Sequence, residues 1–286
     1  ATTTGVWSGG SGSFNPSNIL LSTNYLPSAA DLLAGQVKLY LSSTNNGNCN
    51  QAKDSLLVFF TSPPNVNAGT NISICKNNPI TVLAGVITGP TTTGVWAGGT
   101  GTFTPNNTVL TATYIPTAAE IAAGVVNLSL TSTLNGNCNQ VSDNVLINFT
   151  NPPSVNAGVN LAICKNNSSA VLSGIISGTT TTGIWTGGAG TFNPNNAALN
   201  ATYTPSSGEL TSGIVSLTLT STNNGNCLQV SDNVQINYTP SPVVLAGLNI
   251  SSCKNNPAAV LSGTVSGATT TGVWSGGSGS FNPSNA

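Results

Sequence analysis

Short runs in which apolar and polar residues alternate recur along the whole chain, separated by clusters of Gly, Asn, Pro and Ser. Alternation with a period of two places the apolar side chains on one face of a β-strand, and the turn-forming residues mark its ends. Over residues 152–240 this pattern predicts about seven strands. They cover residues 155–164, 170–176, 182–185, 190–193, 199–203, 214–220 and 230–238.

The connections between these strands carry turn signals of their own. The sequence Asn-Asn-Gly-Asn at 223–226 predicts a hairpin between the last two strands, and Lys-Asn-Asn at 165–167 predicts a turn after the first strand. Residues 206–213 predict a single helical turn before the sixth strand. No longer helix is expected.

The pattern repeats with a constant period. Trp7, Trp96, Trp185 and Trp274 follow one another at steps of 96−7 = 89, 185−96 = 89 and 274−185 = 89, each inside TTTG(V/I)W-x-GG-x-G-x-F. Residues 1–18 are identical to residues 268–285, an offset of 267 = 3 × 89. A fixed period of this kind indicates tandem modules. We expect the chain to be a window from a longer repetitive polypeptide.

Proline-containing joints predict the module boundaries, because proline ends strands and stiffens linkers. The joints lie at 63–64, 152–153 and 240–242. Complete modules are therefore predicted at 63–151 and 152–240, with the later strands of another module at 1–62 and the first strands of a fourth at 241–286.

Seven short strands in about 90 residues, with a tryptophan on the third, predict an all-β fold of tandem immunoglobulin-like β-sandwich modules. In that fold the indole fills the space between the sheets, so all four tryptophans are predicted core residues. An exposed carbohydrate-binding tryptophan is the alternative. We favour the core position because a module this small needs its largest side chain inside.

Charged residues are few, and their scarcity excludes some classes of partner. The chain has five Lys, no Arg and six acidic residues, for a net charge of −1. No basic surface can form to neutralise phosphates, so nucleic acid is not an expected partner. No run approaches the roughly 20 apolar residues of a membrane helix, so no membrane span is expected in this segment.

Six cysteines form two series with the same period of 89. The series are Cys49, Cys138, Cys227 and Cys75, Cys164, Cys253. Two cysteines per repeat indicate disulfides and an oxidising compartment. A zinc site is disfavoured because there is no His and no CxxC pair. The acidic residues stand singly rather than in the groups that calcium prefers. We therefore expect no metal and no cofactor.

Catalytic residues are also missing from the pattern. Without His, a hydrolytic triad or a general base active near neutral pH would need an unusual substitute. The glycine-rich runs at 8–13 and 97–102 lack the Lys-Ser or Lys-Thr and the following helix of a phosphate loop. An enzyme is not expected.

The motifs NAG-x-N-x-x-ICKNNP, TTTGVW-x-GG-x-GTF-x-PNN and NGNC-x-QVSDNV recur, with conservative changes, along the whole chain. This pattern resembles tandem Ig-like or PKD-like repeats of secreted surface proteins of Bacteroidota. The resemblance implies export by a type IX system, attachment at the cell surface, and a role in stalks, filaments or adhesins.

Two disulfide arrangements stay open, and an Ig-like order favours the one that crosses the junction between modules. The first turn and the last hairpin of one module lie at opposite ends of the sandwich, about 30 Å apart at roughly 3.3 Å per residue, too far for a disulfide. Modules joined end to end would instead pair Cys75 with Cys227. The alternative is Cys75–Cys138 and Cys164–Cys227 within modules, each closing 138−75 = 63 residues and worth about 4 kcal/mol.

These observations predict a non-catalytic structural segment of a long extracellular filament or adhesin stalk, stiffened by disulfides. Its partners would be neighbouring modules of the same chain or copies of itself. One alternative is a self-assembling pilus-like fibre, in which residues 241–286 of one subunit complete residues 1–62 of the next by strand addition. The other is an adhesin module that binds a glycan or a surface ligand.

Overall fold

The computed structural model describes residues 3–283. Residues 1–2 and 284–286, at the outer ends of the two predicted partial modules, lie outside this range. The chain forms two compact units, Ala1–Ile72 with Ile80–Asn148 and Ser73–Pro79 with Phe149–Ala286. The short segment Ser73–Pro79 thus packs with residues that follow it by more than 70 positions.

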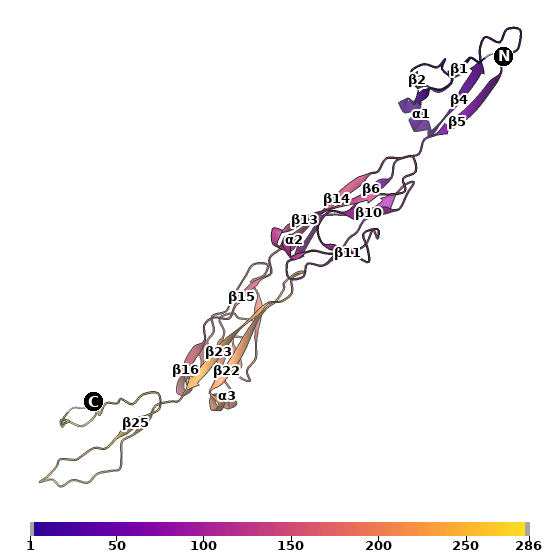
Figure 1. The fold of residues 1–286 in the computed structure, drawn as a ribbon. Helices are drawn as coiled ribbons and strands as arrows, with labels where there is room; N and C mark the ends of the chain where they lie inside the picture. The colour runs from indigo at the N-terminus through magenta and orange to yellow at the C-terminus, as the bar shows by residue number, and fades with distance from the viewer. Residues whose placement is uncertain (1–2, 284–286) are drawn as a thin grey trace. The chain divides into compact units, whose positions relative to one another are not determined.

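Residues 152–240 form a two-sheet sandwich, drawn in the pink to orange part of Figure 1. One sheet has the order β16-β23-β22-β19 and the other the order β17-β21-β20, with the ribbon β15-β18 beside them. Their bounds are β15 Ser154–Asn156, β16 Leu161–Cys164, β17 Ala170–Val171, β18 Ile175–Ser177, β19 Gly183–Thr186, β20 Thr191–Asn193, β21 Thr202–Thr204, β22 Ile214–Ser221 and β23 Ser231–Thr239. The tryptophan strand β19 pairs with β22, which is the immunoglobulin-like arrangement.

The first predicted strand of this module, 155–164, was wrong as one continuous element. It divides into β15, which pairs antiparallel with β18, and β16, which pairs parallel with β23. The chain changes partners at Ala157 and Gly158, where Ala157 N–H donates to Asp232 Oδ2 at 2.9 Å and Gly158 takes a φ of +90°. The predicted strand 170–176 divides in the same way into β17 and β18.

The core of this sandwich lies between the sheets and is centred on Trp185. Its indole is 0% exposed and its Nε1–H donates to the carbonyl of Leu199 at 3.2 Å. Tyr203, Leu217 and Ile236 are also 0% exposed around it. A fully buried aromatic with its polar atom satisfied removes a large apolar area from water at no unpaired hydrogen-bond cost.

The predicted helical turn is confirmed as α3 (Ser207–Ser212), and its two ends follow capping rules. The Ser206 side chain accepts from Glu209 N–H, the Glu209 side chain accepts from Ser206 N–H, and Gly213 ends the helix with a φ of 78°. Glu209 Oε1 also accepts from the buried Tyr203 hydroxyl at 2.7 Å. The carboxylate therefore ties the helix to the core.

The pKa values in this network follow from its hydrogen bonds. Burial opposes ionisation of Glu209, but donors from Tyr203, Ser206 and Ala189 outweigh it and hold the pKa of Glu209 below its ordinary value. In the preceding repeat, burial and the hydrogen bond to Glu120 raise the pKa of Tyr114 to about 12. The carboxylates are thus charged acceptors at neutral pH.

Residues 63–151 repeat this architecture. Their sheets have the orders β10-β13-β14-β7, β11-β12-β8 and β6-β9. The elements are β6 Asn65–Asn67, β7 Ile72–Cys75, β8 Thr81–Val82, β9 Val86–Thr88, β10 Gly94–Ala97, β11 Thr102–Thr104, β12 Thr113–Ile115, α2 Ala118–Ala123, β13 Val125–Ser132 and β14 Ser142–Thr150. Trp96 is 0% exposed, as Trp185 is.

The outer parts of the chain hold fewer elements. Residues 3–62 form the sheets β1-β4-β5 and β2-β3 with α1, and residues 241–283 form the ribbon β24-β25. Their bounds are β1 Gly5–Ser8, β2 Ser13–Asn15, β3 Asn24–Leu26, α1 Ala29–Ala34, β4 Gln36–Ser43, β5 Lys53–Phe59, β24 Val243–Leu245 and β25 Thr264–Ser266. Trp7 and Trp274, both predicted core residues, are half-buried here.

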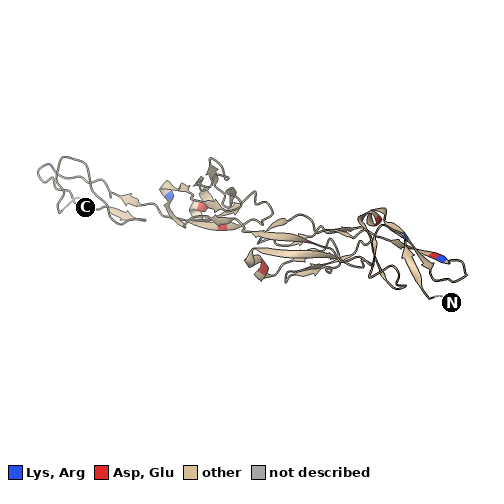
Figure 2. Cartoon of the chain, turned by 90° about the horizontal axis from the view of Figure 1, so that it is seen from above, with Lys and Arg blue, Asp and Glu red and all other residues tan. Residues whose placement is uncertain are grey.

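The fold is therefore all-β and built from tandem immunoglobulin-like sandwiches. The helices α1, α2 and α3 have six residues each, so none of the helices among residues 3–283 could cross a membrane. Charged residues are few and scattered along the chain (Figure 2), in agreement with the five lysines and six acids of the sequence.

Candidate functional site

The candidate site joins the first turn of one repeat to the last hairpin of the next, within the second compact unit. The turn starts where β7 ends. Asn78 N–H donates to the carbonyl of Cys75 at 3.0 Å and closes a tight turn. Lys76 N–H donates to the carbonyl of Thr150 at 2.9 Å, which holds the turn beside the end of β14. We call residues 75–78 the loop.

The receiving element is the connection between β22 and β23. Asn223 and Gly225 take positive φ values of 55° and 61°, which the Asn-Asn-Gly-Asn sequence accommodates with little strain. Cys227 N–H donates to the carbonyl of Asn224 at 3.1 Å and fixes the position of this cysteine. We call residues 223–228 the hairpin.

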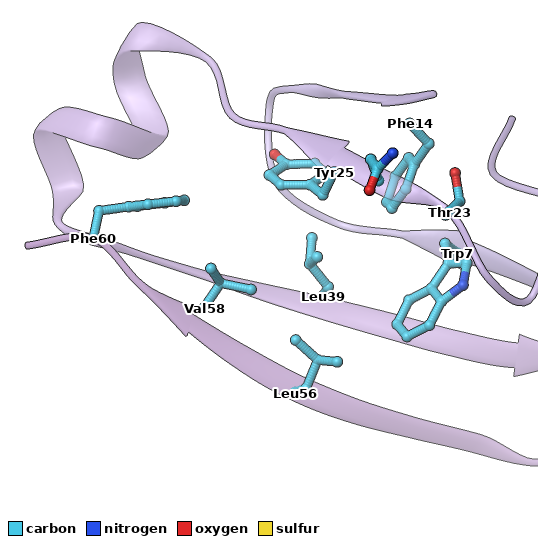
Figure 3. A pocket seen from close by; sticks show the side chains of 9 residues that line it. Trp7, Phe14, Thr23, Tyr25, Leu39, Leu56, Val58 and Phe60 are labelled. Atoms are coloured by element: carbon cyan, nitrogen blue, oxygen red, sulfur yellow. The ribbon is translucent and has the colours of Figure 1, made fainter. Parts of the chain in front are cut away.

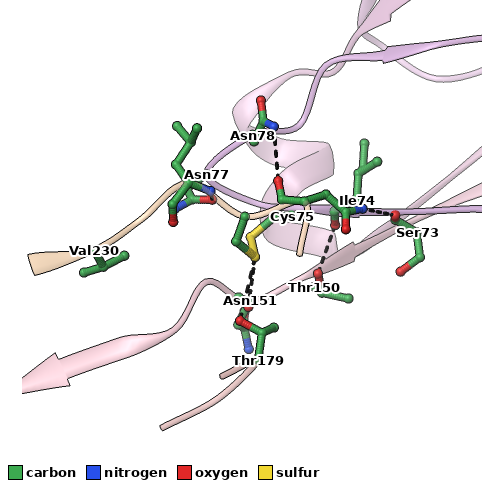
Figure 4. The surroundings of a disulfide bond; sticks show 12 residues. Ser73, Ile74, Cys75, Asn77, Asn78, Thr150, Asn151, Thr179 and Val230 are labelled. Carbon is green, nitrogen blue, oxygen red and sulfur yellow. Dashed lines mark hydrogen bonds between the residues drawn. A yellow bond between two sulfur atoms is a disulfide. The ribbon is translucent and has the colours of Figure 1, made fainter. Parts of the chain in front are cut away.

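A disulfide joins Cys75 of the loop to Cys227 of the hairpin (Figure 4). The Cα atoms are 4.9 Å apart and the bond spans 152 residues. Of the two pairings left open by the sequence, the structure therefore contains the one across the junction. Cys138, the partner required within the module, is unpaired.

Side-chain amides reinforce the disulfide on both sides. Asn77 forms two hydrogen bonds with the backbone of Leu228, donating from Nδ2 to the carbonyl at 3.1 Å and accepting the N–H at Oδ1 at 3.0 Å. Asn78 Nδ2 donates to the carbonyl of Asn226 at 3.1 Å. Asn226 Nδ2 in turn donates to the carbonyl of Ser73 at 2.7 Å.

The bond and the four amide contacts together form what we call the lock. Closing a loop of 152 residues restricts the unfolded chain by about 5 kcal/mol on the chain-entropy model. Each hydrogen bond adds about 1 kcal/mol. Cys75 is 0% exposed and Cys227 is half-buried, so the bond is shielded mainly on its Cys75 side. The lock is chemically a cross-link.

The remaining predicted disulfide cysteines are unpaired in the structure. Cys49 and Cys253 are exposed, and Cys138 and Cys164 are partly buried. Cys138 Sγ lies 3.7 Å from the carbonyl of Ser62, as Cys227 Sγ lies 3.9 Å from that of Asn151, the equivalent residue one repeat later. Cys138, although unpaired, thus lies beside the backbone carbonyl equivalent to the one beside Cys227 in the lock.

Sequence reasoning named the two cysteines of the lock but not its asparagines. The sequence predicts a turn role for Asn226 and for Asn166 and Asn167, the equivalents of Asn77 and Asn78, and residue type and position explain that role. Their recurrence beside both cysteines in every repeat was the signal available. Each has a counterpart 89 residues away, such as Asn166, Asn167 and Asn137.

The acidic residues are used within the modules. Asp31, Glu120 and Glu209 each complete a capping box. Asp143 and Asp232 accept backbone N–H groups from Ala68 and Ala157, both at 2.9 Å. Among residues 3–283, no three side chains of Cys, Asp or Glu gather closely enough to hold a metal ion.

The chain is similar to solved structures, but its sequence matches no known family. No family model and no curated protein matches the chain. A three-Ig segment of titin (I67–I69) superposes with a TM-score of 0.40 at 13% identity, covering 83% of this chain and 89% of that one. Extracellular domains 3–5 of Drosophila OTK give 0.34 at 10% identity, with coverages of 82% and 85%. Immunoglobulin domains 1–5 of Sidekick-1 give 0.33 at 13% identity, with coverages of 92% and 60%.

Proposed function

We propose that the chain is a non-catalytic, force-bearing segment of an extracellular filament or adhesin stalk, in which locks between successive modules limit extension. The observation that carries this proposal is the Cys75–Cys227 disulfide, which joins two successive repeats instead of closing one. A bond inside a module would stabilise that module alone. A bond across the junction changes the path that tension takes.

The load path follows from the connectivity. Tension entering from the N-terminal side reaches Cys75 and crosses the disulfide to Cys227, so the 152-residue interval between them carries no load through its backbone. In a series of such modules, the next loop cysteine lies only 253−227 = 26 residues further on. The covalent path would then use about 26 residues of each pair of repeats, which contains 2 × 89 = 178. Such a chain resists extension even when a sandwich opens.

The remaining features support an extracellular location. A disulfide persists in oxidising surroundings, and a surface rich in Ser, Thr, Asn and Gly stays hydrated with little charge. The sequence resemblance to repeats of Bacteroidota surface proteins supports export by a type IX system and anchoring at the cell surface. Proline joints near the predicted boundaries at 62/63, 151/152 and 240/241 support treating each 89-residue repeat as one mechanical module.

A glycan-binding adhesin module is the second function to weigh. Exposed aromatic side chains are the usual platform for sugar rings, and the tryptophans of the complete modules, Trp96 and Trp185, are 0% exposed. Phe59 is the one large aromatic with high exposure, at 67%, within the described residues. Burial of the indoles therefore supports the spacer function over glycan binding.

Single-molecule extension tests the proposal. The chain is held near its two ends and stretched until the sandwiches unfold, first in oxidising buffer and then with a reductant. Reduction should release the 152-residue interval, adding roughly 500 Å of contour length at about 3.5 Å per residue. Cys75→Ser should show the longer extension without reductant.

Cys49→Ser is the matched control, because Cys49 is unpaired and outside the lock. It should extend like the unaltered chain under oxidising conditions. Equal extension of Cys75→Ser and Cys49→Ser in oxidising buffer would overturn the proposal, since the lock would then carry no load.

A further inference from the structure

The outward face of strands β4 and β5 differs from the equivalent face of the two complete modules. Along β4 (Gln36–Ser43), the core-facing residues are identical in the three repeats, and every outward residue differs from both of its equivalents. The outward residues are Gln36, Lys38, Tyr40 and Ser42, where the complete modules have Val125, Asn127, Ser129 and Thr131 or Ile214, Ser216, Thr218 and Thr220. Differences confined to one face keep the core and change what that face can bind.

Strand alternation separates this outward face from the core. Leu39, Leu56 and Val58 point toward Trp7 and Tyr25 across a cavity of about 360 Å³ (Figure 3). Successive side chains of a strand point to opposite faces of the sheet. The residues that alternate with these three along β4 and β5 therefore lie on the other side, away from the cavity.

We call five of these outward residues the outer patch: Lys38, Tyr40, Lys53, Leu57 and Phe59. The register places Lys38 opposite Leu57, and Lys53 lies diagonally across from Tyr40. The Nζ atoms of Lys38 and Lys53 are 5.4 Å and 3.9 Å from the centroid of the Tyr40 ring. At such distances an aromatic ring attracts an ammonium group. Tyr40 thus gathers two positive charges at one place.

The other end of the outer patch is apolar. Leu57 is 50% exposed and Phe59 is 67% exposed. Phe59 lies opposite Gln36, and Lys53 lies opposite Ser42. Phe59 and Lys53 are therefore at opposite ends of β5, about 20 Å apart at roughly 3.3 Å per residue. The outer patch combines paired cations with an exposed apolar surface along one strand.

The equivalent face is also exposed in a complete module. Leu146, the equivalent of Leu57, is 38% exposed in residues 63–151. The equivalents of the other four residues are half-buried at Ser129 and exposed at Asn127, Ser142 and Asn148. This face is thus an outer surface of a module with a closed core. What distinguishes the first repeat is the chemistry of the surface and not its exposure.

The acidic residues of this repeat lie elsewhere. Residues 3–62 contain two of them, Asp31 and Asp54. Asp54 lies opposite Leu41 and so has the core-facing register. Asp31 Oδ2 accepts from the Tyr25 hydroxyl at 2.7 Å in the capping network of α1. The outer patch therefore carries two positive charges and no negative one, and it complements an anion.

We propose that the outer patch binds an acidic polysaccharide, a chain of pyranose rings that carries carboxylate or sulfate groups. The ammonium groups of Lys38 and Lys53 bind the anionic substituents, and Phe59 and Leu57 pack against the apolar face of a ring. The complete modules, with uncharged residues at the equivalent positions, remain spacers. This binding site goes beyond the proposed function and does not depend on the lock.

Two other anionic partners fit the outer patch less well. β4 is hydrogen-bonded to both β1 and β5, so its backbone offers no open edge to which a peptide strand could add. Recognition of an anionic membrane typically uses clusters of about four to eight Lys or Arg, and the patch has two lysines. A polysaccharide needs neither feature, because its rings and charged groups contact side chains alone.

Isothermal titration of the chain of residues 1–286 at low ionic strength tests the proposal. The probes are polygalacturonate, dextran sulfate, neutral dextran and polyphosphate. At least one of the two charged polysaccharides should bind, at least tenfold more tightly than dextran and polyphosphate, and high salt should weaken it. Failure of both to bind, or equal affinity for dextran or polyphosphate, would overturn the proposal. Binding to phosphatidylglycerol vesicles but to neither charged polysaccharide would also overturn it.

A matched pair of double variants assigns the binding to the outer patch. Lys38→Asn with Lys53→Ser introduces the residues of the next repeat, and should weaken binding at least tenfold. Lys165→Asn with Lys254→Asn removes the same charge from positions outside the patch, and should leave the affinity unchanged. Equal affinities of the two double variants would overturn the proposal, because binding would then follow net charge and not the patch.

A gain of binding provides the converse test in a complete module. Leu146 already stands where the outer patch has Leu57, so four substitutions transfer the patch to residues 63–151. They are Asn127→Lys, Ser129→Tyr, Ser142→Lys and Asn148→Phe. Titration with short oligosaccharides of the polymer that binds should show two sites per chain instead of one. An unchanged number of sites would overturn the proposal.

Discussion

Residues 182–192 and 271–281 have nearly the same sequence but different structures. In the first segment, Gly183–Thr186 and Thr191–Asn193 are strands and Trp185 is 0% exposed. In the second, the equivalent residues form no strand and Trp274 is half-buried. The difference lies outside the segments. β22 and β21 pair with the first, and their equivalents would follow residue 286 in the repeat frame.

Strand formation in this protein therefore depends on a partner sheet more than on local propensity, as is general for β-structure. The short helix behaves differently. The capping box of α1 forms with Asp31 although the core beside it is open, just as those of α2 and α3 form beside closed cores. The short helix thus forms in either setting, whereas a strand forms only where its partner strand is present, as β1 does beside β4.

The largest expected effect comes from the tryptophan. Trp185→Ala should destabilise its sandwich by about 4 kcal/mol, because a wholly buried indole leaves a cavity. Hydrogen exchange of β22 peptides, read by mass spectrometry, should accelerate by about three orders of magnitude.

Trp274→Ala is the control for this change. It removes the same side chain from a half-buried position, and should cost less than about 1 kcal/mol. A similar loss for both variants would contradict the difference between the two segments.

A smaller effect of the same kind is expected at a leucine. Leu172 is 2% exposed and Leu261, one repeat later, is 42% exposed. Leu172→Ala should cost about 3 kcal/mol by the loss of buried apolar surface and the cavity left behind, and Leu261→Ala much less. Denaturant unfolding followed by hydrogen exchange in each repeat measures the two. If Leu261→Ala proved the more costly, the C-terminal strands would have to be packed in a core of their own.

The strands that were predicted well are those that stay in one sheet along their length. The runs 214–220 and 230–238 correspond to Ile214–Ser221 and Ser231–Thr239 within one residue. The run 155–164 failed because a period-two pattern reports which face is buried and not which strand is paired. The change of partners at Ala157 depends on Asp232, which lies 75 residues away.

The site was predictable only in part for a related reason. The period of the cysteines excluded neither pairing by itself; the length of a strand and the end-to-end arrangement of sandwiches favoured Cys75–Cys227. The amide contacts of Asn77 and Asn226 depend on the approach of two elements about 150 residues apart. Nothing in either short motif distinguishes a turn former from a cross-junction donor.

The smallest expected effect concerns the carboxylate network, which is present in both open and closed modules. Glu209→Ala should cost about 2 kcal/mol at neutral pH, because the buried Tyr203 hydroxyl loses its acceptor and the helix its capping box. The folded pKa of Glu209 lies below its ordinary value of 4.5. Its contribution is therefore complete above pH about 4.5 and is lost as the pH falls through the folded value.

Glu209→Gln separates charge from hydrogen bonding in this network. The single amide oxygen replaces only one carboxylate oxygen, so it can accept either from Tyr203, which donates to Oε1, or from Ser206, which donates to Oε2. Part of the neutral-pH stability should therefore remain, while the dependence on acid pH at this site should disappear. Unfolding free energies measured from pH 7 down to pH 3 give the pH dependence of stability for the unaltered chain and for Glu209→Gln. An unchanged acid dependence in Glu209→Gln would show that other carboxylates, such as Asp232 with its own lowered pKa, control the acid stability of the closed module.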